Sequence, residues 1–121
     1  MKMMRGVRGA TSVERDSPEQ ILIETKRLLT EMIQQNGIEL EDIASVFFTT
    51  SPGVVSDFPA KAARQLGWLH VPLLCGHEMA VEKGLDRCIR VMIHWNTDKS
   101  QLEVQHIYLN EAIKLRPDLL G

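Results

Sequence analysis

The chain has 121 residues, of which 44% are hydrophobic and 25% are charged, and its formal net charge at pH 7 is −2. This length and composition predict one soluble globular domain over residues 1–121, with a single hydrophobic core. The slightly acidic charge argues against a nucleic acid or an anionic membrane as a partner, because each of these requires a basic protein face.

The amino-terminal third predicts a strand followed by a well-marked helix. Residues 4–13 read as the strand. Ser17 is a suitable N-cap for the helix, Pro18 suits its first position, and Gln20 would complete a capping box. Apolar residues then recur at helical spacing up to Asn36-Gly37, a typical C-terminal stop.

The rest of the chain predicts a second, shorter helix and several more strands. The helix would be capped by Ser56 or Asp57, with Pro59 early in its first turn, and would run through Leu66 to Gly67. The further strands are expected at residues 44–50, 71–75, 85–95, 104–109 and 113–115, with turns at residues 96–100 and 110–112.

This order of elements is typical of an α+β fold, in which a mixed β-sheet carries two main helices on one face. Two helices are too few to cover both faces of a sheet of five or six strands. One face would therefore stay bare unless an oligomer buries it, and we expect the chain to self-associate.

Arg90 is the most informative residue, because it interrupts the otherwise apolar strand sequence of residues 88–95. A guanidinium is always charged, and its burial requires a carboxylate or an anionic ligand. Strand alternation separates two sets, Cys88, Arg90, Met92 and His94 on one face and Ile89, Val91, Ile93 and Trp95, the expected core, on the other. The alternative to ligand binding is a salt bridge between Arg90 and a carboxylate of a neighbouring subunit.

Three other arginines, Arg8, Arg64 and Arg116, also occur in unusual contexts. If they converge with Arg90, they form a pocket for a small molecule with several negative charges. Glu78, at the end of the third predicted strand, would by itself be read as the ion-pair partner of an arginine. Four further residues would by themselves be read as core or filler residues: Phe58, Cys75, Tyr108 and Leu115.

The sequence carries no signature of a cofactor, a metal or a catalytic nucleophile, so no cofactor is expected. The segment Gly6-Val7-Arg8-Gly9 lacks the Gly-Lys-Ser/Thr ending of a phosphate-binding loop. No spacing of Cys and His residues suits a zinc site. No apolar run is long enough to cross a bilayer, and the amino terminus lacks a signal-peptide pattern. We therefore expect a cytoplasmic protein in which Cys75 and Cys88 are both reduced.

Several short motifs follow one another along the chain. They are Arg5-Gly6-Val7-Arg8-Gly9-Ala10-Thr11, Val13-Glu14-Arg15-Asp16, Phe58-Pro59-Ala60-Lys61-Ala62, Cys88-Ile89-Arg90-Val91-Met92, His106-Ile107-Tyr108-Leu109 and Leu115-Arg116-Pro117-Asp118-Leu119. In this order they resemble the trimeric α/β class of chorismate mutases, and the resemblance covers essentially the whole chain. Each motif is weak alone, but the ordered set is highly specific.

The resemblance implies a homotrimer with a barrel-like core and with pockets shared between adjacent subunits. It also implies the Claisen rearrangement of chorismate to prephenate, on the way to phenylalanine and tyrosine. Chorismate carries two carboxylates, an ether oxygen and a ring hydroxyl, which an arginine-rich pocket suits. The reaction needs no proton transfer and no covalent intermediate, so positioning and fixed charges would accelerate it.

The resemblance further implies a role for each site residue. Arg90 would face the ether oxygen and Glu78 would lie near the ring hydroxyl, as the two catalytic residues. The substrate-binding residues would be Arg8 and Tyr108 at the enolpyruvyl carboxylate, Cys75 near the ring hydroxyl, Phe58 and Leu115 in packing contacts, Leu74 beside the substrate, and Lys61, Arg64 and Arg116 as surrounding positive charge.

Two other function classes stay open at this point. One is the imine deaminase family, which shares the trimeric fold and uses an arginine to hold a carboxylate, although its sequence motifs differ. The other is a non-catalytic module that binds a small anion.

Overall fold

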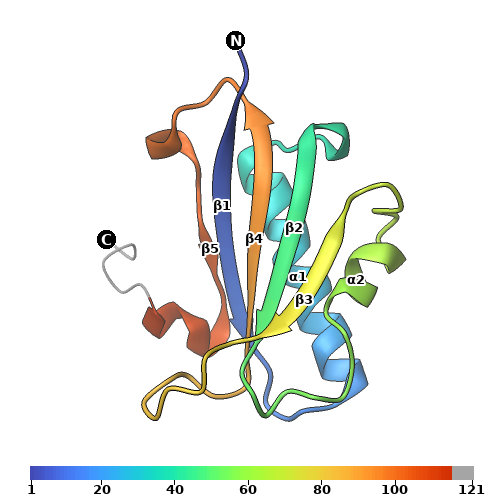
Figure 1. Cartoon of the computed structure of the whole chain (residues 1–121), viewed down its shortest axis with the longest axis vertical. Coiled ribbons are helices and arrows are strands. Elements are labelled where there is room, and N and C mark those ends of the chain that lie inside the picture. The colour runs from blue at the N-terminus through green and yellow to red at the C-terminus, as the bar shows by residue number, and fades with distance from the viewer. Residues whose placement is uncertain (116–121) are drawn as a thin grey trace.

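The structure, a computed structural model, describes residues 1–115. In this part of the chain, one sheet contains the strands β1 (Met3–Ser12), β2 (Ile43–Thr50), β3 (Leu73–His77), β4 (Cys88–Thr97) and β5 (Ile107–Tyr108). Their order in the sheet is β3-β2-β4-β1-β5 (Figure 1). The central strand β4 is antiparallel to both β1 and β2, whereas β3 is parallel to β2 and β5 is parallel to β1. The expected mixed sheet is therefore confirmed.

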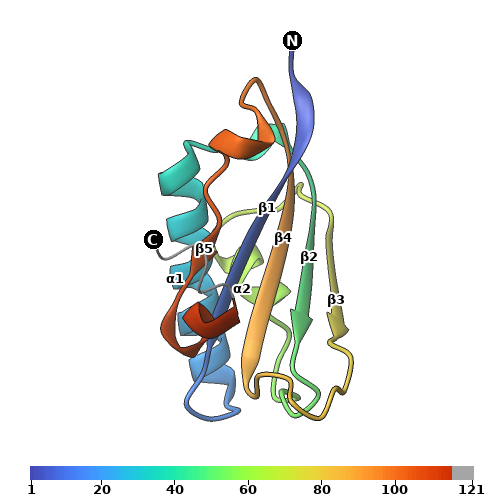
Figure 2. The same ribbon diagram turned by 90° about the vertical axis from the view of Figure 1, so that its left-hand side faces the viewer.

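The helices within residues 1–115 are α1 (Pro18–Asn36) and α2 (Ala60–Gln65), with three short 3₁₀ helices, η1 (Leu40–Asp42), η2 (Gln101–Glu103) and η3 (Asn110–Leu115). Seen along the sheet, α1 and α2 lie on the same side of it (Figure 2). This confirms the α+β architecture with two main helices on one face. The opposite face, called the open face below, has no α-helix across it in the described part of the chain.

The ends of α1 follow from its sequence, with one correction. Ser17 caps the helix by accepting a hydrogen bond from the Gln20 backbone N–H at 3.2 Å, and Gly37 ends it in the left-handed region at φ 71°. The reciprocal half of the predicted capping box is wrong, because the Gln20 side chain accepts from the Glu14 N–H at 3.3 Å instead. That bond ties the helix start to the end of β1.

The core lies between α1 and the sheet, and the predicted alternation of β4 is confirmed. Ile89, Val91, Ile93 and Trp95 are buried, whereas Arg90, Met92 and His94 are only half-buried on the open face. The backbone of β1 approaches α1 closely at Gly9, where an added Cβ would lie 2.4 Å from the Met32 sulfur. Glycine at this position therefore lets the helix pack directly on the strand.

Several predicted bounds differ from the structure for local reasons. The third strand begins at Leu73 and runs to His77, past the predicted end, because its pairing with β2 continues to Thr50. The fourth begins only at Cys88, since Arg87 takes a left-handed φ of 49°, and it extends to Thr97 through pairing with β1, so the predicted turn at 96–100 starts too early.

The second helix also differs from its prediction. It begins after Pro59, which has no side-chain capping bond, and it ends at Gln65. The predicted caps, Ser56 and Asp57, lie upstream of the helix, where the Asp57 carboxylate accepts from the Phe58 N–H at 2.8 Å. The expected cap is therefore wrong, although a helix is present in this region.

The predicted last strand at 113–115 is wrong, because this segment belongs to the 3₁₀ helix η3. The fifth strand is also shorter than expected, with only Ile107 and Tyr108 paired to β1. Asn110 has a left-handed φ of 54°, which turns the chain away from the sheet. Ala112 is then buried against β1 and β4 and fixes the new direction.

Candidate active site

Arg90 lies in the middle of the sheet, on the open face. Its strand neighbours are Thr49 on β2 and Ala10 on β1. The side chain keeps 30% of its exposure and lines a depression in the surface. The sequence predicted this orientation from alternation alone.

Glu78 is brought to Arg90 by the pairing of β3 with β2. Its backbone N–H donates to the Thr50 carbonyl at 2.7 Å, which continues the β3 pairing by one residue. Its carboxylate oxygen Oε2 lies 3.6 Å from Arg90 Nε, and the Thr49 hydroxyl donates to the same oxygen at 2.7 Å. Glu78 is thus the ion-pair partner of Arg90 in the isolated chain, as the simpler reading of the sequence proposed.

Arg8 contributes a second guanidinium to the same depression. A cavity of about 330 Å³ is lined by Arg8, Phe47, Thr49, Glu78, Arg90, Val91 and Met92, and it is called the arginine cavity below. Within residues 1–115, no carboxylate forms an ion pair with Arg8. Two arginines and one glutamate therefore give the cavity a local excess of positive charge, which favours an anionic ligand.

Tyr108 and Leu115 do not line the arginine cavity, and they pack on the end of the open face that η3 covers. Both contact the cluster of Ala10, Cys88 and Ala112. By register Ala10 pairs with Tyr108 on one side and with Arg90 on the other. The Tyr108 hydroxyl is buried and has no hydrogen-bond partner among the described residues, so its hydrogen-bonding capacity is unsatisfied there.

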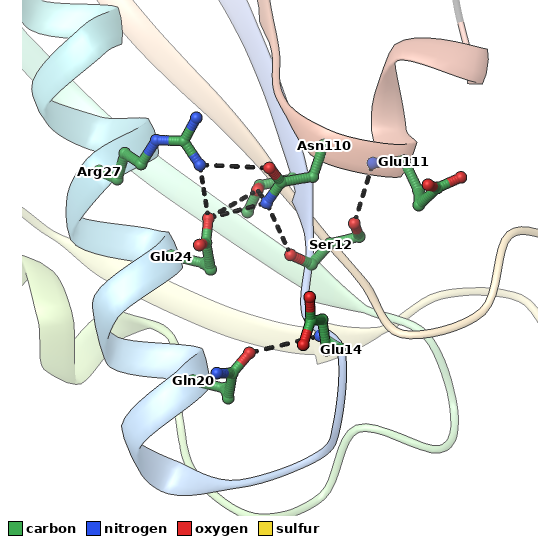
Figure 3. A network of polar contacts seen from close by, with 8 residues as sticks. Ser12, Glu14, Gln20, Glu24, Arg27, Asn110 and Glu111 are labelled. Carbon is green, nitrogen blue, oxygen red and sulfur yellow. Dashed lines mark hydrogen bonds and ion pairs between the residues drawn. The ribbon is translucent and has the colours of Figure 1, made fainter.

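Figure 3 shows how η3 is held in this position. The Asn110 side-chain amide donates to Thr11 Oγ1 at 3.1 Å, to the Ser12 carbonyl at 3.1 Å and to Glu24 Oε2 at 2.8 Å. Its carbonyl oxygen accepts from Arg27 at 3.2 Å. A single residue therefore ties the start of η3 to both β1 and α1.

A second group of predicted site residues lies elsewhere, at the β3 edge of the sheet. A cavity of about 400 Å³, called the Phe58 cavity below, includes Phe58 and Cys75 in its lining. Phe58 is 68% exposed, although the sequence allowed a core role for it. Lys61 pairs with Asp57 at 3.4 Å, and Arg64 is exposed in the last turn of α2.

Leu74, another predicted site residue, lines neither of these two cavities. Leu74 is 61% exposed and pairs with Phe47 in the register of β2 and β3, which places it on the open face. Arg116 lies outside the described residues. Thr49 was missed by sequence reasoning, because nothing in one sequence fixes which residue of β2 faces Arg90 across the sheet.

Both cysteines are free thiols, as predicted. Burial raises the pKa of the Cys75 thiol, and the Ala60 N–H and the Arg64 charge offset this only in part. Burial also raises the pKa of the Cys88 thiol, against a smaller opposing effect of Arg90. A raised pKa keeps each sulfur protonated at neutral pH and therefore weakly nucleophilic.

Residues 1–115 contain no group of three or more His, Cys, Asp or Glu side chains placed to bind a metal ion. The same residues include no helix with the length and apolar character needed to span a membrane.

Comparisons with known proteins agree over most of the chain. Residues 4–119 match the family described as Chorismate mutase type I. Proteins named Chorismate mutase AroH from Thermus thermophilus and from Bacillus subtilis are 51% and 48% identical to the chain over 118 residues, which cover 97% of this chain and 97% and 93% of theirs. The solved structure of a chorismate mutase from Clostridium thermocellum superposes with a TM-score of 0.87 at 45% identity, covering 88% of this chain and 96% of that one.

Proposed function

The chain belongs to the type I chorismate mutase family, and from this premise we propose how its residues convert chorismate to prephenate. The observation that carries the activity is an identity of about half over nearly the full length of two chorismate mutases. The chain is accordingly an isomerase of aromatic amino acid biosynthesis. The imine deaminase and the non-catalytic anion-binding module find no support in these matches.

The reaction breaks one carbon–oxygen bond while a carbon–carbon bond forms within the same molecule. No proton moves, so an acid–base pair would contribute nothing. The protein must hold the enolpyruvyl side chain over the ring, and it must stabilise the negative charge that grows on the ether oxygen. Both tasks require fixed donors and cations, which the arginine cavity supplies.

The three charged residues of the arginine cavity, and Tyr108 and Leu115 from outside its lining, have distinct roles in our proposal. Arg90 donates to the ether oxygen, where its charge matters most as the bond breaks. Glu78 lies beside the ring, where positive charge develops. Arg8 holds the enolpyruvyl carboxylate, because it has no ion-pair partner within the described chain. The unpartnered Tyr108 hydroxyl donates to the same carboxylate, and Leu115 packs against the substrate.

In our proposal, the residues at and around the Phe58 cavity complete the pocket from a neighbouring subunit. Phe58 and Cys75 line a cavity separate from the arginine cavity, and these two cavities share no lining residue. We propose that assembly apposes the two cavities, so that Phe58 packs on the substrate and Cys75 lies near the ring hydroxyl. Lys61 and Arg64 then add positive charge around it, and Arg116 and Leu74 complete the list of substrate-binding residues.

A homotrimer with a barrel-like core is the assembly we propose. Its support is the open face, on which large apolar side chains are exposed because no α-helix among the described residues covers them. Phe47 is 41% exposed, Leu74 61% and Met4 58%. Burial of such a surface between identical sheets removes apolar area from water. Sedimentation equilibrium at micromolar concentration tests this proposal, and a stable monomer would contradict it.

The cytoplasm is the location we propose, because both cysteines are unpaired and a reducing compartment maintains thiols. We also propose that the chain acts as one domain without a cofactor or a nucleic acid partner.

The deciding experiment follows the absorbance of chorismate after addition of purified protein and identifies prephenate as the product. A module that only binds anions would leave the absorbance unchanged. Release of ammonia from an imine substrate, without consumption of chorismate, would instead support a deaminase.

A further inference from the structure

We propose that Thr49 is a positioning residue, whose hydroxyl fixes the Glu78 carboxylate beside Arg90 and keeps the two charges from closing on each other. The inference rests on the proposed roles of Glu78 and Arg90. It concerns a residue that touches the catalytic glutamate and is not among the residues proposed above to bind substrate.

The geometry singles out one oxygen of Glu78. Thr49 Oγ1 donates to Oε2 at 2.7 Å, whereas Arg90 Nε lies 3.6 Å from the same atom. The first distance is that of a good O–H···O hydrogen bond, and the second is too long for a direct N–H···O bond. The hydroxyl is therefore the stronger of the two local restraints on the carboxylate. No described side chain bonds to the other oxygen, Oε1, which stays free for a ligand.

The backbone geometry explains why the residue that anchors the Glu78 carboxylate belongs to β2. Thr49 pairs with Arg90 across β2 and β4, so both side chains rise from adjacent positions on the open face. Glu78 follows the last residue of β3, and its N–H is held by the Thr50 carbonyl. Its side chain nevertheless has three rotatable bonds, and the segment after it is exposed, with Met79 at 78%. A β-branched threonine in a strand has few χ1 choices, so its hydroxyl is a fixed anchor.

Loss of this anchor has a chemical consequence. An unrestrained carboxylate next to a guanidinium closes into a shorter, two-point ion pair, which is the preferred geometry of that pair. The N–H groups of Arg90 would then donate to Glu78, and fewer of them would be free to donate to the ether oxygen. Because the ether oxygen gains charge only as the bond breaks, the loss should appear in kcat more than in KM.

The test compares Thr49→Val, which keeps the shape and removes the hydroxyl, with Thr49→Ser, which keeps the hydroxyl. We expect Thr49→Val to lower kcat by about tenfold, the effect of one hydrogen bond to a charged group, and to change KM less than about threefold. Thr49→Ser should recover most of kcat. Equal losses in the two variants would overturn the proposal, because shape would then matter and the hydroxyl would not. Unchanged kcat in Thr49→Val would overturn it as well.

A matched control separates positioning from stability. Thr25→Val makes the same substitution in α1, where the Thr25 hydroxyl is buried and has no hydrogen-bond partner within the described part of the chain. It should leave kcat unchanged. If Thr49→Val loses activity only in proportion to a lowered Tm, the role is structural and the proposal is wrong.

A crystal structure of Thr49→Val gives a readout that does not depend on activity. The Glu78 carboxylate should move toward Arg90 and make a direct bond with it. A carboxylate that stays in its original position would overturn the proposal even if the protein were an active mutase. Absence of mutase activity in the parent protein would instead refute the proposed function, while the movement of Glu78 would still test the role of Thr49.

Discussion

Arg90 Nε and Glu78 Oε2 lie 3.6 Å apart on the open face of the sheet, close enough to attract each other but too far apart for a direct hydrogen bond. The glutamate lowers the cost of keeping a guanidinium in this half-buried position. It also leaves the outer nitrogens of Arg90 available to a ligand. An ion pair and a catalytic role for Arg90 are therefore compatible, although the sequence presented them as alternatives.

Arg90→Gln should lower kcat much more than it weakens substrate binding, because the lost charge acts mainly in the transition state. One such preorganised contact is worth on the order of 3 kcal/mol, or about a hundredfold in rate, and more for a full charge shielded from water. Arg90→Lys should recover only part of the rate, since an ammonium lacks the planar fork of donors. Steady-state kinetics on chorismate measure both variants.

Arg64→Ala is the contrasting variant for this experiment. Arg64 is exposed at the end of α2, so its removal should act chiefly through KM. If Arg90→Gln instead keeps its kcat and raises only KM, Arg90 is a binding or structural residue and the electrostatic mechanism is wrong.

Mixed trimers should test whether the two cavities meet between subunits. Arg90→Gln and Lys61→Ala each impair every site of their own homotrimer under our proposal. When the two variant chains are unfolded and reassembled together in equal amounts, about a quarter of the sites should combine an intact Arg90 with an intact Lys61. The measurement is chorismate turnover before and after reassembly. If the site lies within one chain, mixing restores nothing.

The two thiols should react slowly in the folded protein and without consequence for catalysis. Burial raises the pKa of both Cys75 and Cys88, so the thiolate fraction at pH 8 is smaller than in the unfolded chain. Titration with a disulfide reagent should therefore be faster in urea than in native buffer. Cys75→Ser should keep mutase activity, and its complete loss would contradict the absence of a nucleophile.

The same raised pKa values give a sign for the pH dependence of stability. The folded protein holds the thiol protons more tightly than the unfolded chain does. The contribution of the two thiols to the free energy of unfolding is therefore full below the pKa of an unfolded thiol, about 8.5. It is lost as the pH rises through the higher pKa values of the folded protein. Urea denaturation of the parent between about pH 7.5 and 10 should show this decline, and Cys75→Ser should show less of it.

What could be predicted from the sequence depended on the range of the interactions involved. Helix α1 was predictable because Ser17, Pro18 and Gly37 act within one turn of its ends. Arg90 was predictable as a site residue because its charge conflicts with its own strand. Thr49 could not be found, since its importance arises from cross-strand register with a residue 41 positions later. Register depends on the whole sheet and not on local sequence.

The segment of residues 110–115 shows the same limit of prediction from local sequence. Residues 113–115 alternate apolar and charged side chains, Ile113, Lys114 and Leu115, as a strand would, yet they form part of η3. The deciding residue is Asn110, which adopts φ 54° and bonds to Thr11, Ser12 and Glu24, all of them far away in the sequence. An asparagine before a short apolar run indicates a turn, but it does not reveal which elements will anchor that turn.

Asn110 itself provides the last prediction, because its backbone and side-chain contributions can be separated. Asn110→Gly keeps the left-handed backbone and removes the four hydrogen bonds of the side chain, whereas Asn110→Ala removes the bonds and also strains the backbone. Thermal or urea unfolding should therefore rank the parent above the glycine variant and the glycine variant above the alanine variant, the last two differing by about 1 kcal/mol. Leu115 of η3 packs on the cluster that contains Ala10, the strand neighbour of Arg90, so Asn110→Gly should also raise KM for chorismate more than it lowers kcat. An alanine variant as stable as the glycine variant would show that the left-handed backbone at this position costs nothing. An unchanged KM in Asn110→Gly would show that η3 needs no side-chain anchor to hold the pocket.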